Sequence, residues 1–382
     1  MQALSVYFTF MLIFFVCFIL LYGLLMKELL SKWNTGKEVG WDRLPAVTLI
    51  IPFRNEAAVL SGSLNSIRGI LVKEVIFCND HSDDHSTQII TDYIEKYNLS
   101  HWRLINNKGI GKKAVLTTAI RFSRSDIIYT TDADCTLTNK VLESMLAPFR
   151  NPAIQMVCGP VSVKLGTTFL EKYQLAEWAS ITLVSNYFIN NNKPLMCSAA
   201  NMVYRKAAFY KVDGYRGNEY ISSGDDEFLL KKIAATYGGD SIRYVNHADA
   251  LVITLPTTNL SLYLAQRARW TSKWKLHNQF FHVMTAIVFF SIASIQLGSI
   301  LLVGSSIVYS VFFFVFWLIK IGVDYKVLGN VLKSYHRSLT FYEMISISIF
   351  HPLSVFLIGA FSIFVKNRWK GRVVLTNGLI CK

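Results

Sequence analysis

Charged side chains are scarce in this sequence. Lys, Arg, Asp and Glu make up 17% of its 382 residues, whereas ordinary soluble domains carry about 25%. The six cysteines stand singly, with no Cys-x-x-Cys pair and no disulfide-like framework, which argues against a zinc module and a disulfide-stapled secreted domain. Basic residues outnumber acidic ones by 39 to 25, yet no basic tract is interleaved with aromatics. We therefore expect no nucleic-acid partner, and we assign the positive surplus to membrane lipids or phosphate groups.

Long uncharged stretches toward the two ends account for much of the missing charge. Residues 3–26 contain no charged side chain, and a stretch of that length spans a bilayer. It lacks the basic start and short apolar core of a cleaved signal peptide. We therefore expect residues 1–27 to form an uncleaved transmembrane anchor. Lys27, Lys32 and Lys37 follow it, and positive charge of this kind favours the cytoplasmic side.

A second uncharged stretch, residues 281–319, is about twice the roughly 20 residues that one span needs. It predicts two transmembrane helices within residues 281–322, followed by a polar loop over residues 324–340. Residues 341–366 predict a transmembrane or re-entrant helix that carries His351-Pro352, and residues 367–382 form a basic tail. Four spans would place both termini outside the cell, which the positive tail opposes. A re-entrant last helix is the alternative.

Residues 44–256 have a different pattern, in which short apolar runs alternate with helix-like segments. The runs at residues 47–51, 74–78 and 127–130 are rich in Val and Ile and end at polar or turn residues. This alternation predicts an α/β domain with a mainly parallel, doubly wound sheet. Residues 169–188 predict a long helix, which is either an ordinary packed helix or, given its aromatics, an interfacial one.

Two carboxylates, Asp132 and Asp134, directly follow one of these runs. Ligands of parallel α/β sheets collect at the carboxyl ends of the strands. Side chains two apart point the same way if the chain stays extended, and paired carboxylates suit a hard divalent cation that also binds a diphosphate. A solvated turn is the alternative, because Asp is common in turns.

Six motifs stand in order along the chain: Ile51-Pro52-Phe53-Arg54-Asn55-Glu56, Asn79-Asp80-His81-Ser82-Asp83-Asp84, Gly111-Lys112, Asp132-Ala133-Asp134, Gly224-Asp225-Asp226 and Gln266-Arg267-Ala268-Arg269-Trp270. In this order they resemble the motifs of the family 2 glycosyltransferases. The resemblance covers residues 46–275 or so and implies a glycosyltransferase-A type fold, Rossmann-like, flanked by transmembrane helices. The membrane plan resembles ceramide glucosyltransferase and the cellulose and hyaluronan synthase group. Two positions depart from the usual pattern: Asp225 stands where Glu is common, and Asn79 stands where Asp is common.

The resemblance also implies a role for each motif. Asp226 would be the general base, with Asp225 as the alternative, and Asp134 would bind Mg²⁺ or Mn²⁺ with help from Asp132, which otherwise contacts the ribose. Arg269 has a planar fork suited to a departing diphosphate, and Trp270 would stack on the acceptor or close the site. The remaining donor-binding candidates are Pro52, Arg54, Glu56, Asp80, Lys112 and Gln266.

The implied activity is inverting transfer of a sugar from a nucleotide-diphosphate sugar, by expectation UDP-linked, to a lipid or lipid-linked acceptor. We expect a multi-pass protein of the cell membrane with its catalytic domain, residues 44–256, in the cytoplasm. Residues 257–280 would form an interfacial segment carrying the Gln-x-x-Arg-Trp motif. Two alternatives remain: a processive synthase that extends and exports a glycan, and an inactive scaffold that binds nucleotide-sugar.

Overall fold

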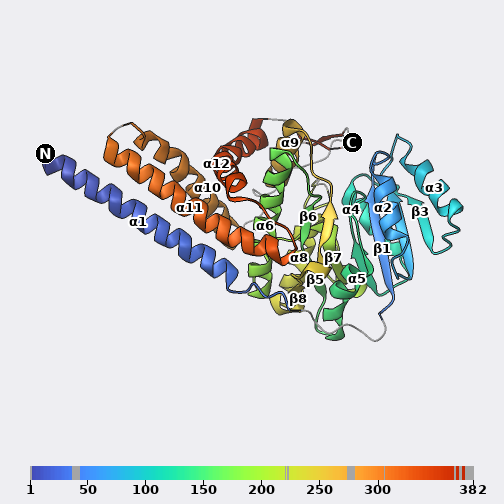
Figure 1. Cartoon of the computed structure of the whole chain (residues 1–382). Coiled ribbons are helices and arrows are strands. Elements are labelled where there is room, and N and C mark those ends of the chain that lie inside the picture. Colours follow the sequence, from blue (N-terminus) through green and yellow to red (C-terminus); the bar gives the residue numbers. More distant parts are fainter. Residues whose placement is uncertain are drawn as a thin grey trace.

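A seven-stranded sheet forms the centre of the domain (Figure 1). The computed structural model describes residues 2–36, 44–219, 221, 223–272, 280–304, 306–364, 367–369 and 372–374. The strand order is β3-β2-β1-β4-β7-β5-β8. Strand β7 runs antiparallel to both of its neighbours, and the other pairings are parallel. The strands are β1 (Val47–Phe53), β2 (Glu74–Asn79), β3 (Trp102–Asn106), β4 (Ile127–Thr130), β5 (Met156–Cys158), β7 (Met202–Arg205) and β8 (Ile242–Tyr244).

Helices cover both faces of this sheet because successive strand residues face opposite sides. In β1, Ile50 joins a buried cluster with helices α4 and α8, whereas Leu49 and Ile51 join the larger cluster with α2, α5 and α6. This doubly covered, mainly parallel sheet is the arrangement that the alternating pattern predicted. The helices of the domain are α2 (Leu60–Ile67), α3 (Ser86–Lys96), α4 (Lys112–Phe122), α5 (Asn139–Leu146), α6 (Phe169–Asn190), α7 (Lys206–Lys211), α8 (Asp225–Tyr237) and α9 (Leu260–Ser272).

Several shorter elements lie outside the seven-stranded sheet. Strands β6 (Val161–Val163) and β9 (Val252–Thr254) form a parallel pair, and β10 (Asn367–Trp369) and β11 (Arg372–Val374) form an antiparallel pair. Pairing of β6 with β9 brings Thr254 back towards the end of β4, where Thr136 bridges to Ile253. The 3-10 turns are η1 (Ala147–Arg150), η2 (Ala199–Asn201), η3 (Gly239–Ser241), η4 (Ala248–Ala250) and η6 (Ile300–Leu302).

Apolar helices extend away from the sheet on one side (Figure 1). They are α1 (Gln2–Leu30), α10 (Phe280–Ser299), α11 (Ile307–Ser334) and α12 (Phe341–Phe364). Among the residues that the structure describes, three stretches are long and apolar enough to cross a membrane, namely Ile13–Leu30, Ile307–Ser334 and Phe341–Ile363, and α10 adds the shorter apolar stretch Val283–Ser299. Large side chains on their outer surfaces are exposed, such as Leu21 at 66% and Phe314 at 58%. Contiguous apolar exposure of this kind is typical of a lipid-facing surface.

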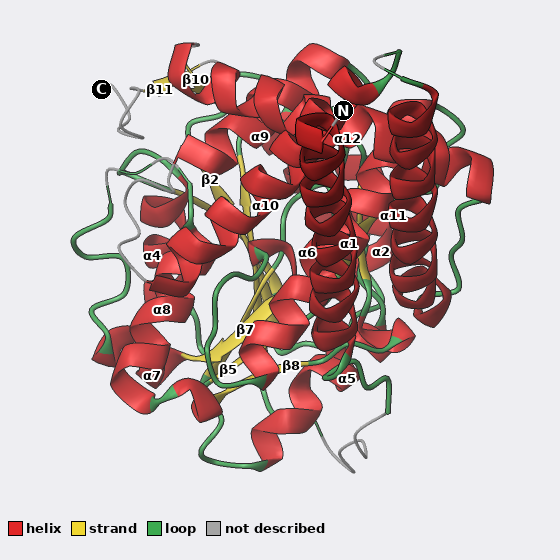
Figure 2. Ribbon diagram, turned by 90° about the vertical axis from the view of Figure 1, so that its left-hand side faces the viewer, coloured by secondary structure: helices red, strands yellow, loops and turns green. Residues whose placement is uncertain are grey.

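Helices α1 and α11 pack together although they come from distant parts of the sequence. The ring centroids of Phe15 and Phe316 are 5.1 Å apart, and the Tyr22 hydroxyl donates to Asp324. Figure 2, seen from the side of the apolar helices, shows α1, α10 and α11 in front of the strands.

We expected a polar loop over residues 324–340. This prediction was wrong for residues 324–334, because α11 continues to Ser334. Lys320 and Asp324 lie one turn apart and form an ion pair of 2.6 Å. Their charges are therefore neutralised within the helix instead of ending it.

Helix α6 is a packed helix rather than an exposed interfacial one. It begins with a capping box, in which Thr168 and Glu171 satisfy each other's backbone N–H groups. Tyr173, Leu175 and Trp178 are buried, and the helix lies between the sheet domain and the apolar helices (Figure 1). It is thus the element through which the two parts of the protein are joined.

Candidate active site

The chain turns immediately after β4, so Asp132 and Asp134 do not continue an extended strand. The Cys135 N–H donates to the Asp132 carbonyl at 3.1 Å and closes the turn. The two side chains consequently have different partners: Asp132 accepts from Lys112, and Asp134 accepts from the Thr254 hydroxyl at 2.9 Å. Burial, and then the nearby charge of Asp132, raise the pKa of the Asp134 carboxyl.

Lys112 connects two acidic segments of the chain. It is the first residue of α4, and its Nζ lies 2.6 Å from Asp132 Oδ1 and 3.3 Å from Asp225 Oδ2. Burial alone would lower the pKa of Lys112, but the carboxylates of Asp132 and Asp225 outweigh it and raise that pKa. The Lys112 ammonium group therefore sits where the two segments meet.

The second acidic segment is the start of α8. Gly224 has φ +80°, a left-handed conformation that glycine adopts without strain, and it turns the chain into the helix. Asp225 is buried with a side-chain exposure of 8%. Burial raises the pKa of Asp225, but the charges of Lys112 and Lys113 lower it overall. The neighbouring Asp226 accepts from the Ala199 N–H at 3.2 Å.

The remaining motifs line the adjacent part of the same sheet edge. Pro52 lies in β1, paired in register with Cys78 of β2. Arg54 Nη1 donates to the Asp80 carbonyl at 2.8 Å, and Asp80 Oδ1 accepts from the Gly111 N–H at 3.1 Å. Glu56 donates its backbone N–H to Ser86 Oγ at 2.8 Å. These bonds tie the ends of β1 and β2 to the start of α4, so that the segments form one surface.

Helix α9 carries the Gln-x-x-Arg-Trp motif next to the acidic segments. Ser223 Oγ donates to the Arg269 carbonyl at 3.4 Å. Burial lowers the pKa of the Arg269 guanidinium, while the charges of Asp225, Asp132 and Asp226 act in the opposite direction. Arg269 therefore lies within electrostatic reach of these carboxylates. The Trp270 ring instead meets Trp178 of α6 edge to face, with centroids 5.9 Å apart.

Asp132 and Asp134 fit a divalent cation of the Mg²⁺ or Mn²⁺ type. Within the described residues there is no group of three or more acidic, His or Cys ligands. Such ions are commonly held by one or two carboxylates together with substrate phosphates, so two carboxylates suffice. Asp134 is desolvated and feels a second negative charge, and a bound cation would relieve both effects.

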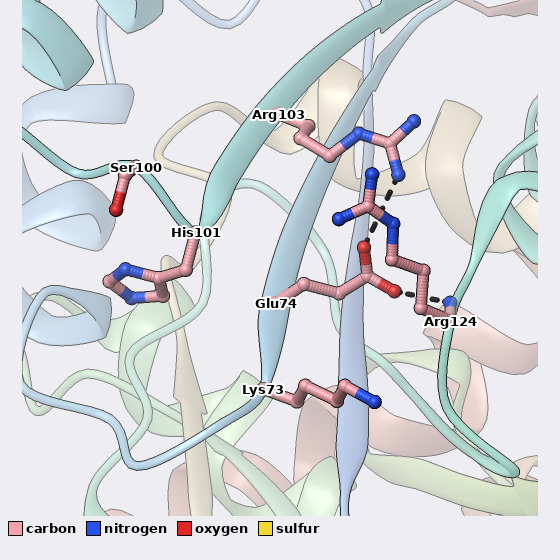
Figure 3. A pocket seen from close by; sticks show the side chains of 6 residues that line it. All are labelled: Lys73, Glu74, Ser100, His101, Arg103 and Arg124. Carbon is pink, nitrogen blue, oxygen red and sulfur yellow. Dashed lines mark hydrogen bonds and ion pairs between the residues drawn. The ribbon is translucent and has the colours of Figure 1, made fainter.

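A cavity of about 230 Å³ lies at the other ends of the strands, beside the first residues of β2 and β3 (Figure 3). Glu74 at the start of β2 is the acidic residue there. It accepts from the Thr48 hydroxyl at 2.8 Å and pairs with Arg103 at 3.3 Å. Since β2 runs from Glu74 to Asn79, this cavity is a full strand length away from Asp80. None of the site residues predicted from the sequence lines it, and we do not place the chemistry there.

Several neighbours of the site were not predicted from the sequence. Thr254 reaches Asp134 from 120 positions away, and the Ala199 N–H reaches Asp226 from 27 positions away. Lys113, which follows Lys112, donates to the Asn218 carbonyl at 2.6 Å and is buried against Phe228. A single sequence contains no periodic signal for contacts of this kind.

Comparison with known proteins identifies relatives of this chain. Residues 48–213 match the family model described as Glycosyl transferase family 2. An N-acetylglucosaminyltransferase of Rhizobium sp. (strain N33) is 26% identical over 246 residues, which cover 61% of this chain and 53% of that protein. A poly-beta-1,6-N-acetyl-D-glucosamine synthase of Staphylococcus aureus (strain COL) is 24% identical over 164 residues, covering 42% and 39%. The chain thus spans about half the length of the first of these curated relatives, and less of the second.

Among solved structures, a mannosyltransferase from Pyrobaculum calidifontis, in complex with GDP-Man and Mn²⁺, has a TM-score of 0.56 to this chain. It is 16% identical in sequence, and the match covers 91% of this chain and 95% of that one. At this identity the likeness concerns the fold. It confirms the glycosyltransferase-A type architecture that the motifs implied.

Proposed function

We propose that the protein transfers a sugar from a nucleotide-diphosphate sugar to a lipid or lipid-linked acceptor, because residues 48–213 match the model of the family 2 glycosyltransferases. Transfer would take place at the cytoplasmic face of the membrane. The apolar helices α1, α11 and α12 support membrane attachment, and Lys27 and Lys32 at the end of α1 support the orientation.

One observation carries the proposal: carboxylates from two distant segments converge on Lys112. Asp132 lies 2.6 Å and Asp225 3.3 Å from its Nζ, while Asp134 and Asp226 are the neighbours of these two residues. Displacement of a diphosphate needs positive charge for the leaving group and a base for the incoming hydroxyl. The two acidic segments and the cations Lys112 and Arg269 supply both requirements at one edge of the sheet.

The donor would lie across the ends of β1, β2 and β4. Pro52, Arg54, Glu56 and Asp80 would hold its base and ribose, because carboxylates accept strong hydrogen bonds from hydroxyl and N–H groups. Lys112 and Arg269 would contact its diphosphate, with Gln266 beside them. Asp134, assisted by Asp132, would hold a Mg²⁺ or Mn²⁺ ion, which neutralises diphosphate charge when it is bound. The mannosyltransferase of the same fold was solved with Mn²⁺, which supports this assignment.

Asp226 would remove the proton of the acceptor hydroxyl as its oxygen attacks the anomeric carbon. The bond from that carbon to the diphosphate oxygen breaks on the opposite face, so the sugar is transferred with inversion. Asp226 is held by the Ala199 N–H at 3.2 Å, which would fix its direction. Asp225 is engaged by Lys112 and is the alternative base.

We propose N-acetylglucosamine on a UDP carrier as the first donor to test. The Rhizobium and Staphylococcus relatives are both named for this sugar, which supports the choice. The name of the Staphylococcus relative also supports a second candidate function, namely processive synthesis of a glycan. Single transfer is favoured because a channel for a growing chain needs several packed spans, and the described residues offer only three full-length apolar helices and one shorter one.

The test uses the purified full-length chain in lipid nanodiscs with UDP-N-acetylglucosamine and Mn²⁺. We expect release of UDP that depends on an added lipid extract, together with a lipid product carrying one sugar. A long polymer would establish the processive alternative. No release with any of several nucleotide-sugars, despite measurable nucleotide binding, would establish an inactive scaffold.

A further inference from the structure

Helix α9 presents two different faces to its surroundings. Side chains two positions apart on a helix lie about 200° apart around its axis, and those three or four apart lie on the same side. Arg267 and Arg269 therefore point in opposite directions. Tyr263 and Trp270 share the side of Arg267, and the Gln266 side chain accepts a hydrogen bond from Arg267 Nη1.

The Arg267 side of α9 is anchored to Glu177 of α6. Arg267 Nε lies 2.9 Å from Glu177 Oε1 and Arg267 Nη2 lies 2.5 Å from Glu177 Oε2, while the Tyr263 hydroxyl donates to Oε1 at 2.9 Å. The Arg267 side chain is only 5% exposed, and its guanidinium lies 4.2 Å from the centre of the Trp270 ring. A buried, two-pronged ion pair of this kind fixes orientation as well as contact.

The opposite side of α9 faces the acidic segments of the candidate site. The Arg269 carbonyl accepts from Ser223, which stands two residues before Asp225. The Asp225, Asp132 and Asp226 carboxylates act on the Arg269 guanidinium. A rotation of α9 about its own axis would consequently turn Arg269 away from these carboxylates.

Helix α6 is itself fixed to the apolar helix α12. Tyr173 precedes Glu177 by one turn, and its hydroxyl lies 2.6 Å from Ser354 Oγ and 3.1 Å from His351 Nδ1. The anchor of α9 is therefore attached to an apolar helix as well as to the sheet domain.

We propose that Glu177 is a positioning residue for the transfer reaction, because it holds Arg267 and thereby keeps Arg269 directed at the donor diphosphate. The proposal rests on the proposed function. Glu177 lies outside all six motifs. In this proposal it affects the reaction without touching the substrate. The proposal also gives Arg267 a different task from that of Arg269 within one motif.

The test is a double-mutant cycle with Glu177→Gln and Arg269→Ala in the full-length chain. Removing one donor to a developing oxyanion typically costs about 10²–10³ in kcat, and we expect a loss in that range for Arg269→Ala. Glu177→Gln should lower kcat at least about tenfold, and it should weaken UDP binding by no more than Arg269→Ala does. If Glu177 acts through Arg269, the double variant should be no slower than Arg269→Ala alone.

Independent losses that multiply in the double variant would overturn the proposal, as would a Glu177→Gln enzyme with normal kcat. Glu343→Gln is the matched control, because it removes the 2.6 Å ion pair of Lys172 on α6 with Glu343 on α12 and retains both partners of the Glu177–Arg267 ion pair. It should keep the normal kcat, and a loss equal to that of Glu177→Gln would make the effect one of general α6–α12 packing.

A substitute variant and an assay of the wild type ensure that each result can be interpreted. If Glu177→Gln does not fold, Arg267→Lys replaces it in the cycle, because lysine keeps the charge and loses the planar fork. The wild-type chain is assayed first. Absence of UDP release by the wild type contradicts the proposed function, whereas a turning-over wild type with a multiplicative cycle contradicts only the role of Glu177.

Discussion

Asp225 and Asp226 are adjacent in sequence but occupy different environments. Asp225 is buried and paired with Lys112 at 3.3 Å, whereas Asp226 is only partly buried and is held by a backbone N–H group. A base that accepts a proton from the acceptor hydroxyl must be accessible to that hydroxyl. The local contacts therefore favour Asp226 as the base and give Asp225 the task of holding Lys112.

We predict that Asp226→Asn binds UDP almost as tightly as the wild type and loses turnover. General-base catalysis is worth roughly 10²–10⁴ in rate, so kcat of Asp226→Asn should fall by a factor in that range or larger. The kcat of Asp225→Asn should fall by a smaller factor. Isothermal titration with UDP and a UDP-release assay measure the two quantities. The reverse order, with Asp225→Asn inactive and Asp226→Asn active, would move the base to Asp225.

A second prediction at this scale concerns the metal. Asp134→Ala should lose Mn²⁺ binding and transfer together, because it removes a cation ligand, and should keep its fold, because a carboxylate in the turn after β4 adds little to the apolar core. Paramagnetic resonance of bound Mn²⁺ and circular dichroism provide the two readings. Thr254→Val removes only the hydroxyl that donates to Asp134 at 2.9 Å and should retain binding. Undiminished Mn²⁺ binding by Asp134→Ala would refute the assignment.

At the scale of elements, α11 holds a buried charge pair of Lys320 and Asp324. Their side chains are 3% and 10% exposed and 2.6 Å apart, and Tyr22 of α1 donates to Asp324. Breaking such a pair from one side leaves an uncompensated charge and costs about 3–5 kcal/mol. We predict that Asp324→Asn lowers the melting temperature in detergent strongly and that adding Lys320→Met recovers most of the loss. If the two substitutions each lowered the melting temperature and their effects added in the double variant, the ion pair would not be what stabilises the packing of α1 against α11.

Strands β1, β2 and β4 were predictable, because each is a short apolar run that ends at turn residues near Pro52, Asn79 or Asp132. The candidate residues were predictable from motifs, and the structure brings Lys112, Asp132 and Asp225 together. Contacts such as that of Glu177 with Arg267 were not predictable, because 90 residues separate the partners and no local pattern relates them. The extent of α11 was missed because we took charge as a loop signal without considering the spacing of Lys320 and Asp324.

At the scale of the whole molecule, the number of membrane crossings determines where the basic tail lies. Residues 375–382 are outside the described part of the structure, and four spans stay a prediction. We expect Cys381 to react with a membrane-impermeant maleimide added to intact cells, in a background without the other cysteines. Lys108→Cys, exposed on the catalytic domain, should be protected in the same assay. A protected Cys381 would support the re-entrant form of α12 instead.

The pairing of α1 with α11 also has a consequence for the synthesis of the protein. Tyr22 and Asp324 are separated by 302 positions, and ribosomes add roughly 5–20 residues per second. The first helix must therefore wait about 15–60 seconds (302 residues divided by these rates) before its partner emerges. Tyr22, the partner on the first helix, tolerates lipid during that time because its side chain is uncharged and most of its ring is apolar. The costly charges arrive together, one turn apart on the later helix, and so are already neutralised when they enter the membrane.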